Sequence, residues 1–535
     1  MSRRSGDRDL RSHTGNRKIL PQRVDQVSGE PEIAQLWADK YCNVFNSVND
    51  EHDKEQFLNQ INQVQDSNID SITVNEVKTI VANLEVDKAN GMDMIPNEFF
   101  KFAPDMVIIR LSLLFNAFMT HSFLPNVFTN VLLVPILKNK LKDHCSSDSY
   151  RPIAIATAAS KIFERLLLNR LDGFLYSTDN QFGFKKHHST DSCILVLKEV
   201  IRYYLRLNTP LFLCFVDIKS AFDKVSYWLL LKQLLERGVP LYLLLLLRQW
   251  FTQQQLYVRW GGAVSRGFAM ANGIRQGSVL SPLLFNVYVD QFNTLLNGAK
   301  IGCHIANNPL NNFAYADDLV LVAPSAVALN ELISLCEVLA DRQYIKYSTT
   351  KSKAMCILPS SFSMTVLPKI RLYGENLEYV NKFNYLGHII SNDFYDDEDI
   401  LKETRNLCAR GNALIRQFSF CNMDVKCVLF KSFCYSFYCG ALWANFRVAT
   451  FKRLMVSYNM VMRRLAGVPP WHSARQMFVG LGVQSFPERV RSLCYSMRER
   501  ASSSSNSLLQ TLTCSDAAAG SVLWQRWTQL LDLPP

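Results

Sequence analysis

The sequence predicts an α+β fold, in which strands and helices mix along the chain without a repeated unit. The stretch LFLCFVD (residues 211–217) is a short, continuously apolar run that is typical of a buried strand. By contrast, SYWLLLKQLLE after Ser226 and SPLLFNVYVDQFNTLL after Ser281 have apolar residues at helical spacing, and each begins at a serine that can cap the first turn. No internal repeat of solenoid type is present.

The remaining elements follow the same two periodicities. Gly91 and Pro96 interrupt the first helical region in the loop DKANGMDMIPNEF. In chain order, we expect a helical stretch over residues 33–84, a buried strand over 131–137 (VLLVPIL), a helix from Lys161 with Ser160 as its cap, a strand in QLYVRWGG and mainly helical chain beyond about Asp393.

Composition bounds the class of protein. With 535 residues, 48% hydrophobic and 20% charged, the chain can bury a large core and is neither fibrous nor disordered. The excess of 58 Lys and Arg over 47 acids gives a net charge of +11, which suits a polyanionic partner such as nucleic acid and also describes many ordinary basic proteins. The first twenty-four residues carry seven of these basic residues and read as a disordered arm, either a solvated tail or a nucleic-acid contact.

Targeting and metal-binding patterns are weak. The fourteen cysteines show no zinc-ligand spacing and are expected to be reduced, mostly buried thiols. The N-terminus lacks the apolar core of a signal peptide, and the leucine run after Pro240 is too short for a membrane span. We therefore expect a soluble intracellular protein of the nucleus or cytoplasm, with no membrane partner.

Paired acids stand where the chain otherwise looks buried. Asp317 and Asp318 lie in FAYADDLVLVA, apolar on both sides, and Asp217 ends the apolar run upstream, with Asp223 six residues later. A buried carboxylate needs a cation, a partner or a hairpin tip that lifts it towards solvent. Three acids at the ends of two strands can converge on Mg²⁺, and two such ions can clamp an in-line phosphoryl transfer.

A glycine-containing loop lies between these acids. In NGIRQGSVLSPLLFN, Gly273 and Gly277 free the backbone for close approach to a ligand, and Gln276 adds an amide that both donates and accepts. A surface turn before a helix is the plain alternative. A nucleotide-binding loop is favoured by its position between the metal candidates.

Taken in order, these segments resemble the motifs of a reverse transcriptase, in particular one from a non-LTR (LINE-type, RTE-like) retrotransposon. The resemblance runs from about Asp87 to Ser391, over half the chain. Its motifs are DKANGMDMIPNEFFK, SYRPIAIATAASKIFERLL, NQFGFKKHHSTD, FVDIKSAFDKV, GIRQGSVLSPLLFN, FAYADD, STTKSKAM and NYLGHIIS, the last at the primer-grip turn. Met94 stands where a glycine is common, and Ala316 is one of several residues tolerated before the paired acids.

The resemblance implies a right-hand polymerase fold with fingers, a palm built on an antiparallel sheet, a helical thumb and a helical C-terminal extension. The implied domains are a disordered basic arm (1–32), an N-terminal helical extension (33–86), fingers and palm (87–391, core about 118–391), a thumb-like region (392–470) and a C-terminal tail (471–535). Only about eighty residues precede the first motif, so the N-terminal endonuclease domain of such elements is expected to be absent and supplied in trans.

The resemblance also implies roles for single residues. Asp217, Asp317 and Asp318 would be catalytic and hold two Mg²⁺ ions, with Mn²⁺ as the alternative ion and the backbone carbonyl of Ile218 as a further ligand. Phe222 would exclude a 2′-hydroxyl. Nucleotide contacts would come from Lys138, Arg151, Gln276 and Gly277, and Lys353 would protonate the leaving pyrophosphate.

The implied function is RNA-directed DNA polymerisation, a nucleotidyl transfer from deoxynucleoside triphosphates to a DNA primer on an RNA template. The alternative is a decayed or domesticated copy that acts as a non-enzymatic RNA-binding protein. Intact acids favour the enzyme.

Overall fold

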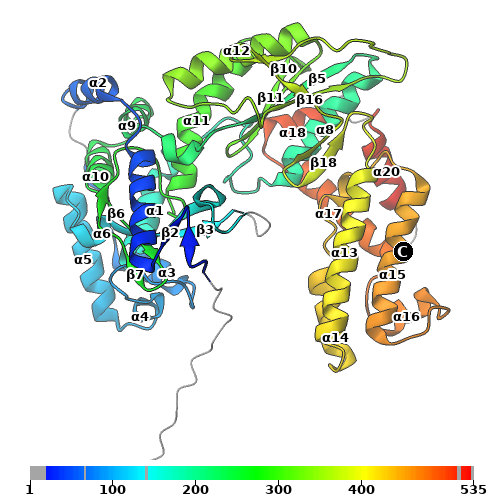
Figure 1. The fold of residues 1–535 in the computed structure, drawn as a ribbon, viewed down its shortest axis with the longest axis horizontal. Helices are drawn as coiled ribbons and strands as arrows, with labels where there is room; N and C mark the ends of the chain where they lie inside the picture. The colour runs from blue at the N-terminus through cyan, green and yellow to red at the C-terminus, as the bar shows by residue number, and fades with distance from the viewer. Residues whose placement is uncertain (1–19, 65–67, 139–142, 515–519, 532–535) are drawn as a thin grey trace, which may run out of the picture. The chain divides into compact units, whose positions relative to one another are not determined.

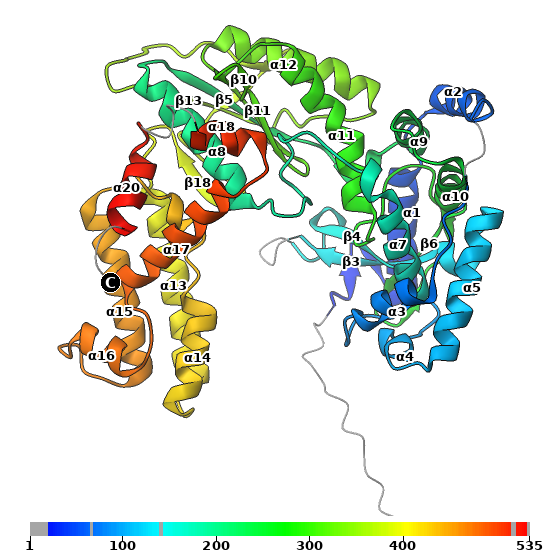
Figure 2. The same ribbon diagram turned by 180° about the vertical axis from the view of Figure 1, so that it is seen from behind.

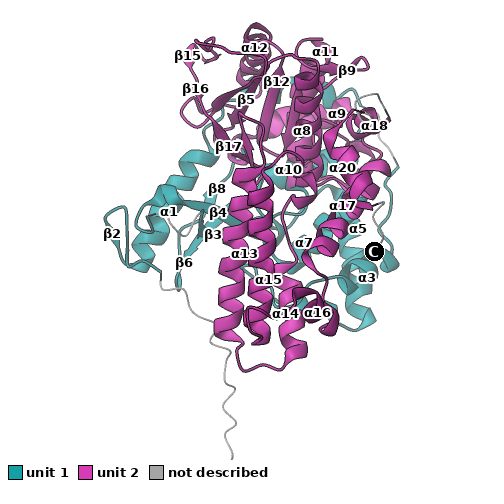
Figure 3. Ribbon diagram, turned by 90° about the vertical axis from the view of Figure 1, so that its right-hand side faces the viewer, with its two compact units in different colours: residues 1–170, 239–281 teal, residues 171–238, 282–535 magenta. Residues whose placement is uncertain are grey.

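The computed structural model describes residues 20–64, 68–138, 143–514 and 520–531. The chain forms two compact units, and each is interrupted in sequence by the other (Figure 3). Unit 1 comprises residues 1–170 and 239–281, and unit 2 comprises 171–238 and 282–535. The linear division into fingers and palm, thumb and tail stays a prediction, because the compact units cut across it.

Unit 1 is a small sheet covered by helices. Its strand order is β4-β3-β6-β7, with β8 also paired to β6. Trp37 packs against Tyr150 and Trp260, with ring centroids 5.1 and 5.8 Å apart, and so fixes the first long helix on the sheet. The elements are β1 (Arg23–Val24), β2 (Val27–Ser28), α1 (Glu30–Phe45), α2 (Glu51–Ile61), α3 (Val74–Ala82), α4 (Asn97–Lys101), α5 (Asp105–His121), α6 (Asn126–Thr129), β3 (Asn130–Leu137), η1 (Ser147–Ser149), β4 (Tyr150–Ile155), α7 (Ala158–Leu171), α10 (Leu241–Thr252), β6 (Gln255–Trp260), β7 (Ala263–Val264) and β8 (Phe268–Ala269).

Unit 2 contains a five-stranded sheet followed by a helical region (Figures 1 and 2). Its first part consists of η2 (Asp172–Phe174), α8 (Thr190–Arg206), β5 (Leu211–Asp217), η3 (Ala221–Lys224), α9 (Tyr227–Glu236), α11 (Ser281–Gly298), β9 (His304–Ile305), β10 (Asn308–Pro309), β11 (Asn312–Tyr315), β12 (Asp318–Ala323), α12 (Ala326–Arg342), β13 (Lys353–Ile357), β14 (Arg371–Leu372), β15 (Glu375–Asn376), β16 (Glu378–Tyr379), β17 (Lys382–Tyr385) and β18 (His388–Ser391). The helical part consists of α13 (Asp397–Gln417), α14 (Met423–Cys434), η4 (Gly440–Leu442), α15 (Val448–Ala466), α16 (Ala474–Gly480), α17 (Phe486–Ser502), α18 (Ser507–Cys514) and α20 (Val522–Leu531).

The central strand β5 is buried on both faces. The sheet order is β11-β12-β5-β13-β16, with antiparallel neighbours on both sides of β5. Alternate side chains of a strand point to opposite faces, so Leu211, Leu213 and Phe215 pack with α8, whereas Cys214 lies on the face covered by α12. This two-sided burial explains why the strand sequence is continuously apolar up to its terminal aspartate.

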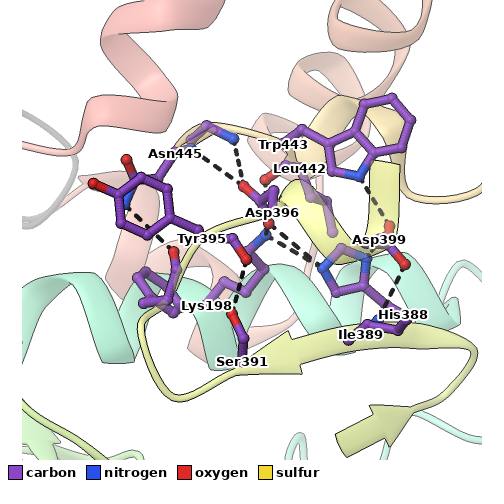
Figure 4. A network of polar contacts seen from close by, with 12 residues as sticks. Lys198, His388, Ile389, Ser391, Tyr395, Asp396, Asp399, Leu442, Trp443 and Asn445 are labelled. Atoms are coloured by element: carbon purple, nitrogen blue, oxygen red, sulfur yellow. Dashed lines mark hydrogen bonds and ion pairs between the residues drawn. The ribbon is translucent and has the colours of Figure 1, made fainter. Parts of the chain in front are cut away.

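A buried polar network joins the hairpin β17–β18 to α8 and to the start of α13 (Figure 4). Lys198 of α8 pairs with Asp396 and donates to the carbonyl of Leu442 at 3.1 Å. His388 Nδ1 lies 2.9 Å from Asp399 Oδ2, which also accepts from the indole of Trp443 at 2.9 Å. Burial alone would raise the pKa of Asp396, but the charges of Lys198 and His388 outweigh burial and lower it. The hairpin is therefore anchored by ionic groups as well as by packing.

Most expected elements are present, with three local corrections. The part of the predicted arm that the structure describes is ordered: residues 23–28 form a hairpin and α1 begins at Glu30, whereas residues 1–19 lie outside the description. Ser160 lies within α7 and is not its cap; its backbone N–H donates to Thr157 Oγ1 at 3.2 Å, so the threonine has the capping role. Helix α11 begins at Ser281 itself.

Other expectations agree with the structure. Ser226 caps α9, since its side chain accepts from Leu229 N at 3.1 Å. Nine of the fourteen cysteines are buried. Within the described ranges, no helix combines the length and the apolar character needed to cross a bilayer. The α+β class with an antiparallel central sheet and a helical C-terminal region is confirmed.

Candidate functional site

Three acids meet at one end of the unit 2 sheet. In the antiparallel pair of β5 and β12, Asp217 lies directly opposite Asp318. Asp317 lies beside them in the two-residue loop between Tyr315 and Asp318, where β11 turns into β12. The register of the sheet therefore brings together residues that are about a hundred positions apart in the sequence.

A buried glutamine fixes the hairpin tip. Ala316 has a positive φ of 57°, which is unusual for a residue with a side chain. Gln181 Oε1 accepts from the N–H groups of Ala316 and Gly183, both at 2.8 Å, and its Nε2 donates to the Ala316 carbonyl at 3.3 Å. A Cβ on Gly183 would lie 2.4 Å from Ala316 N, so this glycine is needed for the close approach. Sequence analysis did not identify Gln181, although it lies in the quoted NQFGF motif.

The backbone around Asp217 is held on the other side by two serines. Asp217 N donates to Ser352 Oγ at 3.0 Å, and Ser348 N donates to the Asp217 carbonyl at 2.9 Å. The Asp217 Oδ2 atom is buried without a hydrogen-bond partner, and Lys351 Nζ lies 3.4 Å from it. A buried carboxylate oxygen that lacks a hydrogen bond is suited to a cation. Ile218, the next residue, forms an isolated bridge with Tyr347.

The charge state of Asp318 reflects this crowding. Asp318 lies at an accessible strand end, but the surrounding protein removes part of the water around its carboxyl group. This desolvation raises the pKa of the carboxyl group. The negative charges of Asp317 and Asp217 raise it further, to about 6. Like charges held this close disfavour ionisation unless a cation compensates them.

The donor set fits a hard cation. Carboxylate oxygens are the ligands that Mg²⁺ prefers, and Asp217 Oδ2, which accepts no hydrogen bond and is paired with Lys351, supplies one. In the part of the chain that the structure describes, no three Asp, Glu, His or Cys side chains form a group that could hold a metal ion as they stand. The backbone thus places the three acids together, while their side chains are not closed around an ion.

Phe222 has aromatic support. It lies in the short helix η3, four residues after Ile218, and stacks on Phe285 with a centroid distance of 4.5 Å. Phe184 contacts it edge-on at 6.3 Å. Phe285 is fully buried in α11, so it fixes the position of the half-buried Phe222 ring. Neither supporting aromatic was expected from the sequence.

The two lysines of STTKSKAM have different partners. Lys353 Nζ donates to Glu378 Oε2 at 2.6 Å and to the Thr350 carbonyl at 2.9 Å. Its ammonium group is therefore engaged by these two partners and not by the acids at the end of β5. Lys351 is the lysine beside Asp217, and its side chain is 70% exposed. The leaving-group role expected for Lys353 stays a prediction, and Lys351 is the lysine of this motif that pairs with Asp217.

The other predicted nucleotide contacts are residues of unit 1. Arg151 on β4 is exposed and lies opposite Ile136 of β3. Lys138 follows that strand, with its N–H bonded to the Ser149 carbonyl at 2.8 Å and its ammonium to the Asp148 carbonyl at 2.9 Å. Side chains alternate along strands, so Arg151 and Lys138 are expected on the same face of this sheet.

The glycine loop lies against the same strand. The Gln276 carbonyl accepts from Ala154 N at 2.7 Å. Gly277 has a positive φ of 111°, and a Cβ at this position would lie 2.9 Å from the Ala154 carbonyl oxygen, so a side chain is excluded. The fully buried Glu164 of α7 anchors the loop and was not identified from the sequence. It accepts from Arg275 at 2.7 Å and from Ser278 Oγ and Val279 N at 2.6 Å each.

Comparison with known proteins matches these elements to one family. Residues 136–390 match the family model "Reverse transcriptase (RNA-dependent DNA polymerase)". The chain is 25% identical over 458 residues to the RNA-directed DNA polymerase from mobile element jockey of Drosophila funebris. This alignment covers 83% of this chain and 49% of the relative. It is 30% identical over 244 residues to the probable RNA-directed DNA polymerase from transposon X-element of Drosophila melanogaster, which covers 44% of this chain and 26% of the relative. The chain thus spans about half the length of the curated relatives with the longest matches.

Among solved structures, apo telomerase from Candida tropicalis aligns with 80% of this chain and 72% of its own, at 12% identity and a TM-score of 0.40. The expected resemblance to reverse transcriptases of non-LTR mobile elements is confirmed by the family match and by the names of the sequence relatives.

The raised pKa of Asp318 predicts a pH-dependent stability. The pKa of an aspartate is near 4 in the unfolded chain and about 6 for Asp318 in the folded chain, so this carboxyl group contributes stability to the metal-free protein that is lost as pH rises from about 4 to about 6. Thermal melts across this range should show that the stability of the parent falls relative to that of Asp318→Asn as pH rises, and that the difference is constant above about pH 6.

The control for this experiment is Asp341→Asn, which removes an exposed acid of α12. It should retain the parental pH profile. Equal pH profiles for the parent and Asp318→Asn would contradict the assignment of the shift to this carboxyl group.

Proposed function

We propose that this chain, whose residues 136–390 form a reverse transcriptase domain, is an RNA-directed DNA polymerase of a non-LTR mobile element. The observation that carries the proposal is the cross-strand placement of Asp217 against Asp318, with Asp317 at the adjoining hairpin tip. The substrates are an RNA template, a DNA primer and deoxynucleoside triphosphates. The test is primer extension on an RNA template with purified protein and Mg²⁺.

Asp217, Asp317 and Asp318 would hold two Mg²⁺ ions, with the Ile218 carbonyl as a further ligand and Mn²⁺ as the alternative ion. When bound, the ions would neutralise negative charge that develops during phosphoryl transfer. Gln181 and Ser352 keep the two strand ends in register, so the carboxylates are positioned before substrate arrives. Asp217 Oδ2, which accepts no hydrogen bond, and the raised pKa of Asp318 both support a cation at this position.

The remaining residues bind and orient the nucleotide. The Phe222 ring, fixed on Phe285, would lie against the sugar and exclude a 2′-hydroxyl. Arg151 and Lys138 would bind the triphosphate through charged hydrogen bonds. Gln276 and Gly277 would face the base pair that forms with the template. Transfer joins the primer 3′-oxygen to the α-phosphorus and releases pyrophosphate, to which Lys351 would give a proton.

The alternative, a non-enzymatic RNA-binding copy, would need no acids at the ends of β5 and β12. The family match and the names of the relatives support the polymerase and not this alternative. A primer 3′-hydroxyl has to be provided, and an endonuclease that cuts a DNA strand would provide it.

The acids give the first functional prediction. Asp317→Asn should reduce primer extension roughly 100-fold or more, because a ligand and a charge of the site are lost. RNA binding, measured by filter retention, should stay close to that of the parent because it draws mainly on Lys and Arg contacts with phosphate. Asp223→Asn, in η3 beyond Phe222, is the control and should be much milder. Extension at the parental rate by Asp317→Asn would remove this residue from the site.

The sugar gate gives a second prediction. Phe222→Ala should raise ribonucleotide incorporation relative to deoxynucleotide by about ten-fold or more, because the excluded volume is lost. Single-nucleotide extension with each triphosphate measures the ratio. Phe222→Tyr keeps the ring on Phe285 and should keep the discrimination; an unchanged ratio in Phe222→Ala would place the gate elsewhere.

The two lysines form a matched pair. Lys351→Met should lower the single-turnover rate of extension roughly 100-fold, as the loss of a proton donor does. Lys353→Met removes the same charge two residues away but breaks its pair with Glu378 and its hydrogen bond to the Thr350 carbonyl, and should change the rate by no more than a few-fold. The reverse order of effects would return the role to Lys353.

A further inference from the structure

A hollow lies in the C-terminal helical region, formed by residues of unit 2 alone. It has a volume of about 810 Å³, within the range of ligand pockets, and opens between α15, α16 and the start of α17. Its apolar floor includes Met455, Phe478 and Phe486, and its charged lining residues are Arg475, Arg491 and one acid, Glu488. An apolar floor with two cations and one acid around it suits a ligand that has an apolar part and a negative part.

The floor is rigid. Phe478 and Phe486 are 2% and 1% exposed, and both pack on the fully buried Tyr458 of α15, with centroid distances of 5.4 and 5.8 Å. The Tyr458 hydroxyl donates to the Gln484 carbonyl at 2.9 Å, which fixes the loop at the edge of the hollow. The hollow is therefore held open by a packed aromatic cluster.

The chain that forms the hollow is rich in basic residues. From Val448 to Ser502, the chain carries nine Lys and Arg residues and only two acids, Glu488 and Glu499. Arg475 is exposed, and Arg491 is half-buried. Such an excess favours a polyanion over an acidic or neutral small molecule.

An exposed tryptophan lies next to the hollow in the sequence. Trp471 is 86% exposed and precedes Ala474, a lining residue at the start of α16, by three positions. Its loop is fixed, since the Arg463 guanidinium donates to the His472 carbonyl at 3.2 and 3.0 Å. A large exposed aromatic ring on a fixed loop is a platform for stacking a base.

We propose that this hollow, together with Trp471, binds an unpaired nucleotide of a single-stranded nucleic acid. A base enters the hollow, a neighbouring base stacks on Trp471, and Arg475 contacts the intervening phosphate. The site recognises unpaired strands because a paired base cannot present both faces to protein. It lies apart in sequence from the acids of the sheet, and its binding does not require polymerisation.

The experiment uses full-length protein carrying Asp317→Asn, so that catalysis plays no part. The probe is a short fluorescein-labelled oligoadenylate, compared by anisotropy with a duplex of equal length. Trp471→Ala should weaken binding of the single strand about five-fold or more. Arg475→Gln should weaken it and lower the slope of log affinity against log salt by about one, which Trp471→Ala should not do.

Matched controls come from the last turn of α13 and from the turn that follows it. Phe420 is 85% exposed and Arg416, in the last turn of α13, is exposed, so Phe420→Ala and Arg416→Gln remove an exposed aromatic ring and an equal charge. Both should stay within about two-fold of the parent. A 4-thiouridine-containing oligonucleotide should crosslink to the peptide spanning residues 471–491 in the parent and not in Trp471→Ala.

Three results would overturn the proposal. These are equal losses in the site and control variants, parental affinity in Trp471→Ala, and crosslinks confined to other peptides. Thermal melts of each variant show whether it is folded. Because Trp471 and Arg475 are exposed, their substitution should leave the fold intact, so a loss of binding can be assigned to the site. Because catalysis is absent from the assay, a failure here is distinct from a failure of the polymerase assignment.

Discussion

The pairing of β5 with β12 is the constraint on which the rest of unit 2 depends. It sets Asp217 and Asp318 directly opposite each other, an arrangement that like charges oppose and that the backbone hydrogen bonds of the sheet maintain. The cost appears as the raised pKa of Asp318. Such a site trades stability of the metal-free chain for readiness to bind a cation.

The neighbouring segments hold this pairing in place. Gln181 fixes the tip of the β11–β12 hairpin, and Ser352 fixes the end of β5. Phe383 of the β17–β18 hairpin stacks on Phe215 at 4.1 Å, on the same face as Asp217 two residues along the strand. The buried network around Lys198 and Asp396 then secures that hairpin. Rigid support of this kind is what a pre-positioned set of acids requires.

Sequence reasoning was most successful where a pattern is local. The strand ending at Asp217 and the capped helix after Ser226 follow from periodicity and from one capping residue. Ser160 was misplaced because the true cap, Thr157, is only three residues away and both residues are good caps.

The partners of the site were harder to identify, because they act across long sequence separations. Gln181 bonds to a residue 135 positions away, and Glu164 bonds to Arg275 over 111 positions. A side-chain bond to a distant backbone leaves no periodicity that can be read from one sequence. Choosing between Lys351 and Lys353 likewise required the position of Glu378, which β16 brings beside β13.

The interleaved order of the two units has a consequence during synthesis on the ribosome. Residues 171–238 belong to unit 2 but emerge before residues 239–281, which complete unit 1. Strand β5 within this segment pairs only with β12 and β13, which end at Ala323 and Ile357. Until these are translated, an apolar strand has two open edges, and such edges recruit other chains. Nascent chains that are arrested after β5 and before the end of β13 are therefore the aggregation-prone species. The rate of elongation between these two strands sets how long chaperones have to shield β5.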